Sequence, residues 1–318
     1  MLVVVTVGAI ALAAGIDALR GGSELEPASK GQTGPPASST STDPEPIQPA
    51  SDELGGTLYY TDEACELRAI QLPGQTPAEA PTWDECRFVL SPDATSVSGA
   101  GSAWDPTGDH LFRADGGRIV VLSSDHEPEG SFSGAAASWR QDGTLTYFAE
   151  GAVRTWPRGA ILLSQDDLAE AVRAHPFVPD QGHVQPVAVK ELAWIDKERA
   201  VAVLAGVIGR ASPETILAFF DGHRLTSMRS EGGLRMSGLR VSSSGSYVAL
   251  KSGESLLMLD TRGDVLPAPH LSGYRAIAWS LGERWIAAAT GRGTALFPTG
   301  ESSVERQLPI LAHDLVWR

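Results

Sequence analysis

The chain contains no asparagine, only two cysteines, only four lysines and few aromatic residues, which make up 7% of its 318 residues. Without Asn it has no Asn-x-Ser/Thr acceptor for N-glycosylation. Its 25 basic residues are outnumbered by 39 acidic ones, and they form no basic stripe that would suit a phosphate backbone, so nucleic acid is not expected as a partner. The composition also excludes collagen, a coiled coil, a polytopic membrane protein and a fully disordered chain.

One apolar run stands out at the start of the chain. Leu2–Ile16 is uninterrupted by charge and is followed by Asp17. Fifteen residues are short for a spanning helix of about 20, and suit a signal-peptide core or a short signal anchor within residues 1–20. The usual basic residues before the run are missing, which a start codon placed too far downstream would explain. A buried helix of the folded domain is the alternative.

A polar segment follows this run. Gly, Pro, Ser and Thr make up 21 of the 36 positions from Gly21 to Gly56, and none of the 36 is aromatic. Such a composition cannot seed a core, so residues 21–54 are expected to be a disordered tether and residues 55–318 a folded domain. This order predicts a domain held at a membrane surface outside the cytoplasm, or one secreted after signal cleavage.

The expected domain is all-β. After Gly56 the sequence consists of runs of four to seven strand-forming residues separated by Gly, Asp and Ser. One segment has a helical signature: Ser164 is a candidate N-cap with an acid three residues on, and Leu168, Ala171 and Val172 share a face up to Arg173.

The strands belong to a repeat. Each unit has a small residue, an anchor that is mostly Trp, and a Gly four residues later that permits a turn of positive φ. The anchors lie 35, 55, 47, 38 and 38 residues apart, about the 43 residues of a four-stranded propeller blade, and the longest interval contains the predicted helix; they are Trp104, Trp139, Trp194, Val241, Trp279 and Trp317. In the unit after Trp194 a Glu replaces the Gly, and after Trp279 the Gly, Gly282, comes one residue early. We expect each Trp near the start of an inner strand, filling the wedge between blades.

The two ends of the domain complete one unit. Trp317 has no second strand after it, whereas Gly55–Tyr60 is a turn and strand with no Trp before it. Pairing them would close the ring and remove both sheet edges, which predicts a six-bladed β-propeller. Leu90–Ala94 also resembles the opening of a unit. It is either the outer strand of the closing blade or a remnant that raises the count to seven.

These openings carry a family resemblance. Ala103–Gly108 and Ser138–Gly143 resemble the WD40-like repeats of TolB-type β-propellers, and the resemblance extends loosely over residues 55–318. It implies a fold and a tendency to bind proteins, and it implies no catalytic residues. With the N-terminal run, the layout is similar to membrane-anchored extracytoplasmic propellers of actinobacteria.

Few residues are candidates for chemistry. Cys65 and Cys86 are expected to form a disulfide, because such bonds persist outside the cytoplasm. The bridge would close a loop of 22 residues and stabilise the fold by about 3 kcal/mol. His175 and His183 could bind a metal as a pair, but the histidines show none of the spacings typical of metal ligands. Asp105, Asp109 and Asp115 could surround a calcium ion, but the spacing of a calcium loop is absent. No catalytic, cofactor or metal site is predicted.

Two functions remain. The favoured one is a monomeric, non-catalytic interaction module that docks a protein or an envelope component through a propeller face or through the insertion at 161–190. The alternative is a propeller enzyme, lactonase-like or lyase-like, with its site in the central channel. An enzyme should bring carboxylates, His or Arg together in a cavity at one end of the channel, with shifted pKa values. A scaffold should fill the channel with small or apolar side chains.

Overall fold

The computed structural model describes residues 54–174, 187–206, 214–230 and 234–318. By its internal contacts the chain divides into two units, residues 1–50 and 51–318. The expected anchor and almost all of the tether lie outside the described residues. Within the described part, no helix is long and apolar enough to cross a membrane.

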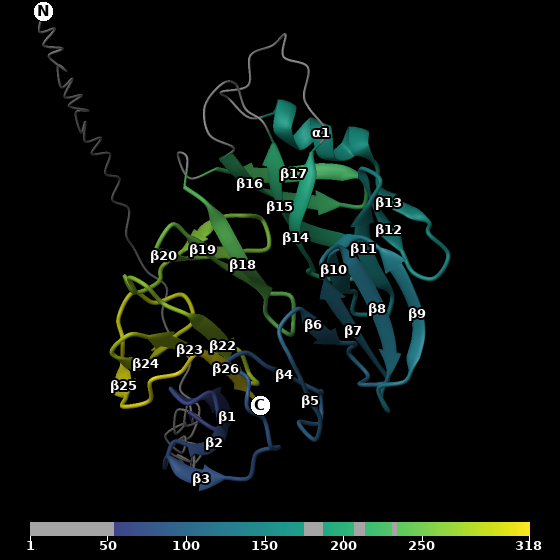
Figure 1. The fold of residues 1–318 in the computed structure, drawn as a ribbon. Helices are drawn as coiled ribbons and strands as arrows, with labels where there is room; N and C mark the ends of the chain where they lie inside the picture. Colours follow the sequence, from purple (N-terminus) through teal and green to yellow (C-terminus); the bar gives the residue numbers. More distant parts are fainter. Residues whose placement is uncertain (1–53, 175–186, 207–213, 231–233) are drawn as a thin grey trace, which may run out of the picture. The chain divides into compact units, whose positions relative to one another are not determined.

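The described chain folds into antiparallel sheets, six of four strands and one of two (Figure 1). Each sheet is named here by its first strand. The β26 sheet combines the last strand with the first three, and the β4 sheet has only two strands: β26 (Asp314–Trp317), β1 (Gly56–Thr61), β2 (Leu67–Leu72) and β3 (Thr76–Ala78); β4 (Val89–Leu90) and β5 (Val97–Ser98).

The other five sheets are each built from four consecutive strands. The β6 and β10 sheets contain β6 (Ser102–Trp104), β7 (His110–Asp115), β8 (Arg118–Ser123) and β9 (Pro128–Ser133); β10 (Ala135–Trp139), β11 (Leu145–Ala149), β12 (Ala152–Thr155) and β13 (Ile161–Leu163). The β14, β18 and β22 sheets contain β14 (Ala188–Trp194), β15 (Arg199–Gly206), β16 (Glu214–Asp221) and β17 (Arg224–Arg229); β18 (Met236–Val241), β19 (Tyr247–Ser252), β20 (Ser255–Asp260) and β21 (Val265–Leu266); β22 (Ala276–Trp279), β23 (Trp285–Thr290), β24 (Gly293–Pro298) and β25 (Arg306–Leu308).

The first strands of successive sheets lie against one another. Strand β14 contacts β10 and β18, β22 contacts β26, and β6 contacts β4 and β10. Consecutive four-stranded meanders whose first strands face one another have the architecture of a β-propeller, in which each blade buries the faces of its neighbours. The expectation of an all-β propeller is confirmed at this level. The number of blades and the closure of the ring stay predictions.

Apolar clusters fill the spaces between successive sheets. Separate clusters join the β6 sheet to the β10 sheet, the β10 to the β14, the β14 to the β18, the β18 to the β22, and the β22 to the β26 sheet. A smaller one joins the β26 sheet to the β4 sheet through Leu67, Phe88 and Leu90. The core is therefore divided into layers between sheets rather than gathered at one centre, as stacked blades require.

The ends of the domain meet in the β26 sheet. Strand β26 pairs antiparallel with β1, so that Trp317 lies opposite Leu58 and Asp314 opposite Thr61. The Trp317 indole N–H also donates to the carbonyl of Gly55 at 3.0 Å. The expected partnership of the last and first strands is thus present as a strand pair.

The predicted helix is confirmed. Helix α1 (Gln165–Arg173) begins after the N-cap Ser164, whose hydroxyl accepts from the Asp167 backbone N–H while the Asp167 carboxylate accepts from the Ser164 N–H. Its residues Leu168, Ala171 and Val172 are buried in the cluster between the β10 and β14 sheets. The apolar face of this insertion is therefore used by the fold. The rest of the insertion, at 175–186, lies outside the described residues.

Two details of the expected repeat are wrong. Each Trp anchor is the last residue of its first strand rather than near its start. Because the turn begins at the next residue, the large ring lies at the end of the strand. The segment Leu90–Ala94 is not an outer strand of the β26 sheet, since Leu90 belongs to β4 and pairs with Val97 of β5 in a sheet of its own.

Candidate binding cavities

The turns after three of the anchors share one hydrogen-bond pattern. In the β6, β18 and β22 sheets, the N–H of the residue after the anchor donates to the carbonyl five residues on, and the N–H four residues past the anchor donates back. The β4 sheet has the same pair, from Ser91 N–H to the Ser96 carbonyl and from Ala94 N–H to the Ser91 carbonyl, both at 2.9 Å. Its turn is thus built like those of the four-stranded sheets, with Leu90 in the place of the Trp.

In five units the fourth position after the anchor takes positive φ. Gly108, Gly143 and Gly245 do so as expected, and Ala94 does so in the β4 sheet. In the β22 sheet the residue is Glu283, with φ of 57°, and not the neighbouring Gly282. Alignment by glycine therefore picked the wrong residue there. A non-glycine residue in this conformation is uncommon and asks for a compensating interaction.

Glu283 has such an interaction. Its side chain is 7% exposed and accepts hydrogen bonds from the Ser243 hydroxyl at 2.8 Å and from the N–H and hydroxyl of Ser244, in the turn of the preceding sheet. Burial alone would raise the pKa of the Glu283 carboxyl, but the hydrogen bonds from these serines lower it below its usual value. The residue that breaks the glycine pattern thus links two neighbouring sheets.

One cavity lies where the first strands end, and we call it the aromatic cavity. It has a volume of about 580 Å³. Six anchors line it, together with the residues two positions after five of them: Leu90, Trp104, Trp139, Val241, Trp279 and Trp317; Pro92, Pro106, Gln141, Ser243 and Leu281. The repeat itself therefore builds this cavity, because five units contribute the same two positions and a sixth contributes its anchor.

The indole N–H groups around this cavity differ in their partners. That of Trp139 donates to the carbonyl of Ala103 at 2.8 Å, and that of Trp317 to Gly55. Those of Trp104 and Trp279 are buried and have no hydrogen-bond partner within the described residues. A buried donor without an acceptor costs about 1–3 kcal/mol, so these two positions favour a ligand that brings an acceptor.

The fifth tryptophan anchor does not line the aromatic cavity. Trp194 is buried, and its N–H donates to the Thr146 hydroxyl at 2.7 Å in the preceding sheet. The Arg140 guanidinium lies 5.0 Å from its ring centroid. Trp194 thus has the wedge role that the sequence predicted for all the anchors.

The rim of the aromatic cavity includes exposed apolar residues beside the polar Gln141 and Ser243. Leu281 is 76% exposed, more than any other large apolar side chain of the described chain. Pro92 and Pro106, at the same position of their units, are also exposed. Aromatic rings surrounded by exposed apolar residues are typical of protein contact surfaces.

A second cavity lies toward the other ends of the first strands, and we call it the charged cavity. Its volume is about 650 Å³. Four cations and two acids line it, with His313: Arg87, Arg240, Lys251, Arg275, Glu191 and Asp314. Arg240, Ile277 and Asp314 line both cavities, which places the two along one path between the first strands.

Both acids of the charged cavity have their oxygens engaged by the backbone. The Glu191 carboxylate accepts from the N–H groups of Gly238, at 2.9 Å, and Leu239. Asp314 is 8% exposed and accepts from Leu315, at 3.0 Å, and Phe88, at 3.3 Å. Burial raises the pKa of the Asp314 carboxyl, and the nearby Arg240 and Arg87 only partly oppose this.

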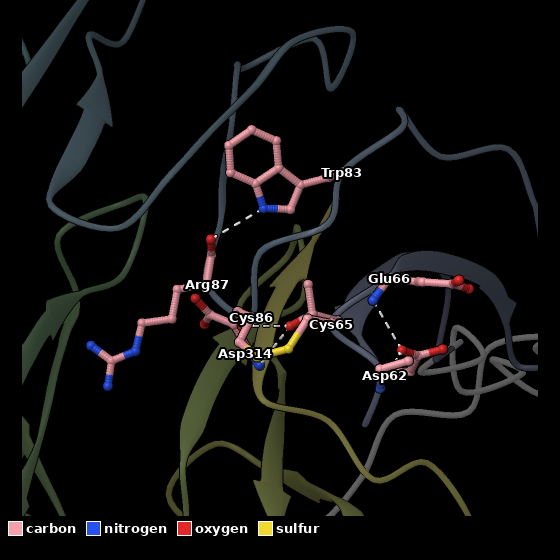
Figure 2. Close-up of a disulfide and its surroundings, with 9 residues drawn as sticks. Asp62, Cys65, Glu66, Trp83, Cys86, Arg87 and Asp314 are labelled. Atoms are coloured by element: carbon pink, nitrogen blue, oxygen red, sulfur yellow. Dashed lines mark hydrogen bonds between the residues drawn. A yellow bond between two sulfur atoms is a disulfide. The ribbon is translucent and has the colours of Figure 1, made fainter.

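A disulfide holds one wall of the charged cavity. The structure joins Cys65 and Cys86, whose Cα atoms are 4.3 Å apart. The Cys86 carbonyl accepts from the Thr61 hydroxyl at 2.7 Å, and Figure 2 shows the Arg87 side chain extending away from the disulfide. Arg87 is therefore held in place through its neighbour and through Phe88.

The remaining candidates from the sequence stay apart or serve the fold. The Asp105 carboxylate bonds the Gly108 N–H and the His110 ring within its own turn, and it does not share a site with Asp109 and Asp115. Within the described residues the only group that could hold a metal is Cys65, Cys86 and His313, and its two thiols form the disulfide. His175 and His183 lie outside the described residues.

Comparisons with known proteins add little. No protein-family model and no curated protein matches the chain. Among solved structures, it is similar to the β-propeller domain of Cps50 (Swd1) of Myceliophteria thermophila, with 13% identity, 68% of this chain and 88% of that one covered, and a TM-score of 0.37. It is also similar to the C-terminal WD40 domain of Sif2, with 11% identity, 78% and 68% coverage, and a TM-score of 0.43. Likenesses of this size carry no weight for function.

Proposed function

We propose that the chain is a membrane-tethered, extracytoplasmic β-propeller of the TolB type that binds a segment of another protein in its aromatic cavity. The observation that carries the proposal is that cavity: Trp rings, exposed apolar residues at the rim, and two buried indole N–H groups that have no acceptor in the described part of the chain. A peptide in extended conformation supplies backbone carbonyls for such donors. Tryptophan is enriched among the residues that contribute most to protein binding.

The proposal includes a ring of seven positions. Six are four-stranded blades and the seventh is the two-stranded β4 sheet. The support is the shared turn pattern after Leu90 and the place of Leu90 in the aromatic cavity beside the Trp anchors. In this ring β26 closes the circle by pairing with β1. A two-stranded blade would leave its outer side without the third and fourth strands that the other blades have.

The docking is tested with a photo-reactive amino acid in place of Leu281, at the rim of the aromatic cavity. The matched control carries the same amino acid in place of Val265, which is 49% exposed on the outer strand β21. We expect a discrete cross-linked product in membranes from Leu281 and none from Val265. Trp279→Phe, which keeps an aromatic ring but loses the five-membered ring that carries the N–H, should reduce the yield.

Three outcomes separate the possibilities. Equal products from both positions would refute docking at the aromatic cavity. A cross-link to the chain's own residues 21–54 would show that the tether, and not another protein, occupies the aromatic cavity. A product from Leu281 that Trp279→Phe leaves unchanged would refute the role of the unpartnered N–H.

Tethering rests on the sequence of residues 1–54 and is tested by fractionation. We expect the full chain in the membrane fraction and accessible to protease from outside the cytoplasm. A chain without residues 1–20 should be found in the cytoplasm, with reduced cysteines. A full chain that fractionates as a cytoplasmic protein with free thiols would refute the proposed location.

The charged cavity favours a second candidate, an enzyme with its site in the channel. It has the size of a ligand site and a buried acid of raised pKa, Asp314. No nucleophile hydrogen-bonded to a base lines it within the described residues, so no mechanism can be assigned. Lactone hydrolysis by the purified chain that is lost in Arg240→Gln would establish this candidate. Equal rates with and without protein would remove it.

A further inference from the structure

The charged cavity is unusual for this chain. The whole protein carries a net charge of −14, yet four cationic side chains line this one cavity. Three of them are arginines from segments far apart in the sequence: Arg87 before β4, Arg240 in β18 and Arg275 before β22. Folding therefore gathers positive charge in this cavity although the whole chain is acidic.

The donors of the cavity exceed its acceptors. Both carboxylates already accept two backbone N–H groups each. The side chains of Arg87, Arg240 and Arg275 make no hydrogen bond or ion pair within the described residues. A guanidinium presents five N–H donors in a fixed fork that matches the geometry of carboxylate and phosphate oxygens.

The net charge of the cavity also depends on its fourth cation, Lys251, and on its two acids. Lys251 has a partner, Glu254, at 3.2 Å. Four cationic side chains face only two carboxyl groups in the lining of the cavity. The cavity thus keeps an excess of positive charge, and a volume of about 650 Å³ is in the range of small-molecule sites.

We propose that the charged cavity binds a small molecule through an oxyanion group, a carboxylate or a phosphate, held between the forks of Arg240, Arg275 and Arg87. The site is separate from peptide docking in the aromatic cavity and does not depend on it. Arg240 is the central ligand, because among the three arginines it alone lines both cavities. Arg87 takes part because the disulfide and the Phe88 N–H bond to Asp314 hold its segment at the wall.

The test is isothermal titration calorimetry of the full chain in a neutral detergent, with two probes. Inorganic phosphate tests a tetrahedral oxyanion and succinate a dicarboxylate, which separates the two ligand chemistries. We expect saturable binding of one equivalent of at least one probe, at constant ionic strength set with chloride. Arg240→Gln and Arg275→Gln should each weaken binding tenfold or more, and Arg240→Lys less than Arg240→Gln, because it keeps the charge and loses the fork.

The matched control is Arg292→Gln. Arg292 is an exposed arginine in the turn between β23 and β24, away from the cavity. If Arg292→Gln weakens binding as much as Arg240→Gln does, the attraction is non-specific and the proposal is overturned. Absence of saturable heat for both probes would overturn it as well. Thermal unfolding of each variant without probe separates loss of the site from loss of the fold.

Discussion

Glu283 offers a sharp test of how neighbouring sheets are held together. It occupies the turn position that is Gly in three other units, with φ of 57°, and its carboxylate accepts from Ser243 and Ser244 of the preceding sheet. Glu283→Ala removes the carboxylate and keeps the strained backbone. Glu283→Gly removes the carboxylate and relieves the strain. The two substitutions therefore separate two contributions at one site.

The magnitudes follow from the contacts. A hydrogen bond to a charged group contributes about 1.5–3 kcal/mol, and the Ser243 and Ser244 hydroxyls can turn to water once the acceptor is gone. We expect Glu283→Ala to lower the free energy of unfolding by about 2–3 kcal/mol. The left-handed conformation costs a non-glycine residue about 1–2 kcal/mol, so Glu283→Gly should be about 1 kcal/mol more stable than Glu283→Ala.

The effect should depend on pH with a known sign. The pKa of Glu283 is lowered in the folded state from its ordinary value of 4.5, with burial opposed by the serine hydrogen bonds. A lowered carboxyl pKa stabilises the fold at pH above the unfolded value, and this contribution is lost as pH falls through the folded one. Glu283→Gln should therefore be destabilising at pH 7, and the difference from wild type should shrink below pH of about 4.

The assay is unfolding in guanidinium chloride, comparing midpoints at unchanged slope. Glu301→Ala is the control, because Glu301 is exposed in the turn after β24 and should change stability by less than about 0.5 kcal/mol. The reasoning is refuted if Glu283→Ala behaves like Glu301→Ala. It is also refuted if Glu283→Gly is the less stable of the pair.

Three further predictions concern the β26 sheet and its neighbours. Replacing both Cys65 and Cys86 by Ser should lower stability by about 3 kcal/mol in denaturant, because the bridge closes a loop of 22 residues; a loss under 1 kcal/mol would contradict this. Trp317→Ala should cost about 3–5 kcal/mol, since the ring is 4% exposed and packs where the last strand joins the first; an unchanged melting temperature would argue against closure by β26. The raised pKa of Asp314 means that the folded state holds a proton which the unfolded state has lost, so this group makes wild-type stability fall as pH rises through that window. Asp314→Asn should lack this fall, and identical pH slopes for the two proteins would show that Asp314 titrates normally.

Local signals in the sequence predicted the local structure. The Ser164 cap with Asp167 marks the start of α1, and the spacing of the anchors marks each first strand. The helix cap depends on residues three positions apart, whereas the anchors recur at intervals of 35 to 55 residues. The repeat pattern pointed to Gly282 because glycine is the residue most often found at positive φ. Glu283 takes this conformation instead, and its buried carboxylate forms hydrogen bonds to the neighbouring sheet.

The charged cavity had no such local signal. Arg87, Arg240 and Arg275 each look like an ordinary surface arginine in sequence, and nothing in their neighbours distinguishes them from Arg292. They meet only because the fold brings three separate segments to the lining of one cavity. The sequence offers only that all three arginines come shortly before an anchor, with Arg87 three residues, Arg240 one residue and Arg275 four residues before it.

The position of a residue along the first strand explains why the two cavities differ in character. The anchor position ends each first strand and is restricted to apolar residues by packing between sheets, so the cavity at that end is lined by four Trp anchors together with Leu90 and Val241. The third position before the anchor is free of that restriction, and it differs in charge and size around the fold: Arg87, Gly101, Ala136, Glu191, Gly238, Ala276 and Asp314. The repeat therefore determines the residue types of the aromatic cavity, whereas the residues that line the charged cavity differ from unit to unit. A repeat protein that evolves a specific ligand has room for it at the charged cavity, which is why we place the oxyanion site there and the broader peptide contact at the aromatic one.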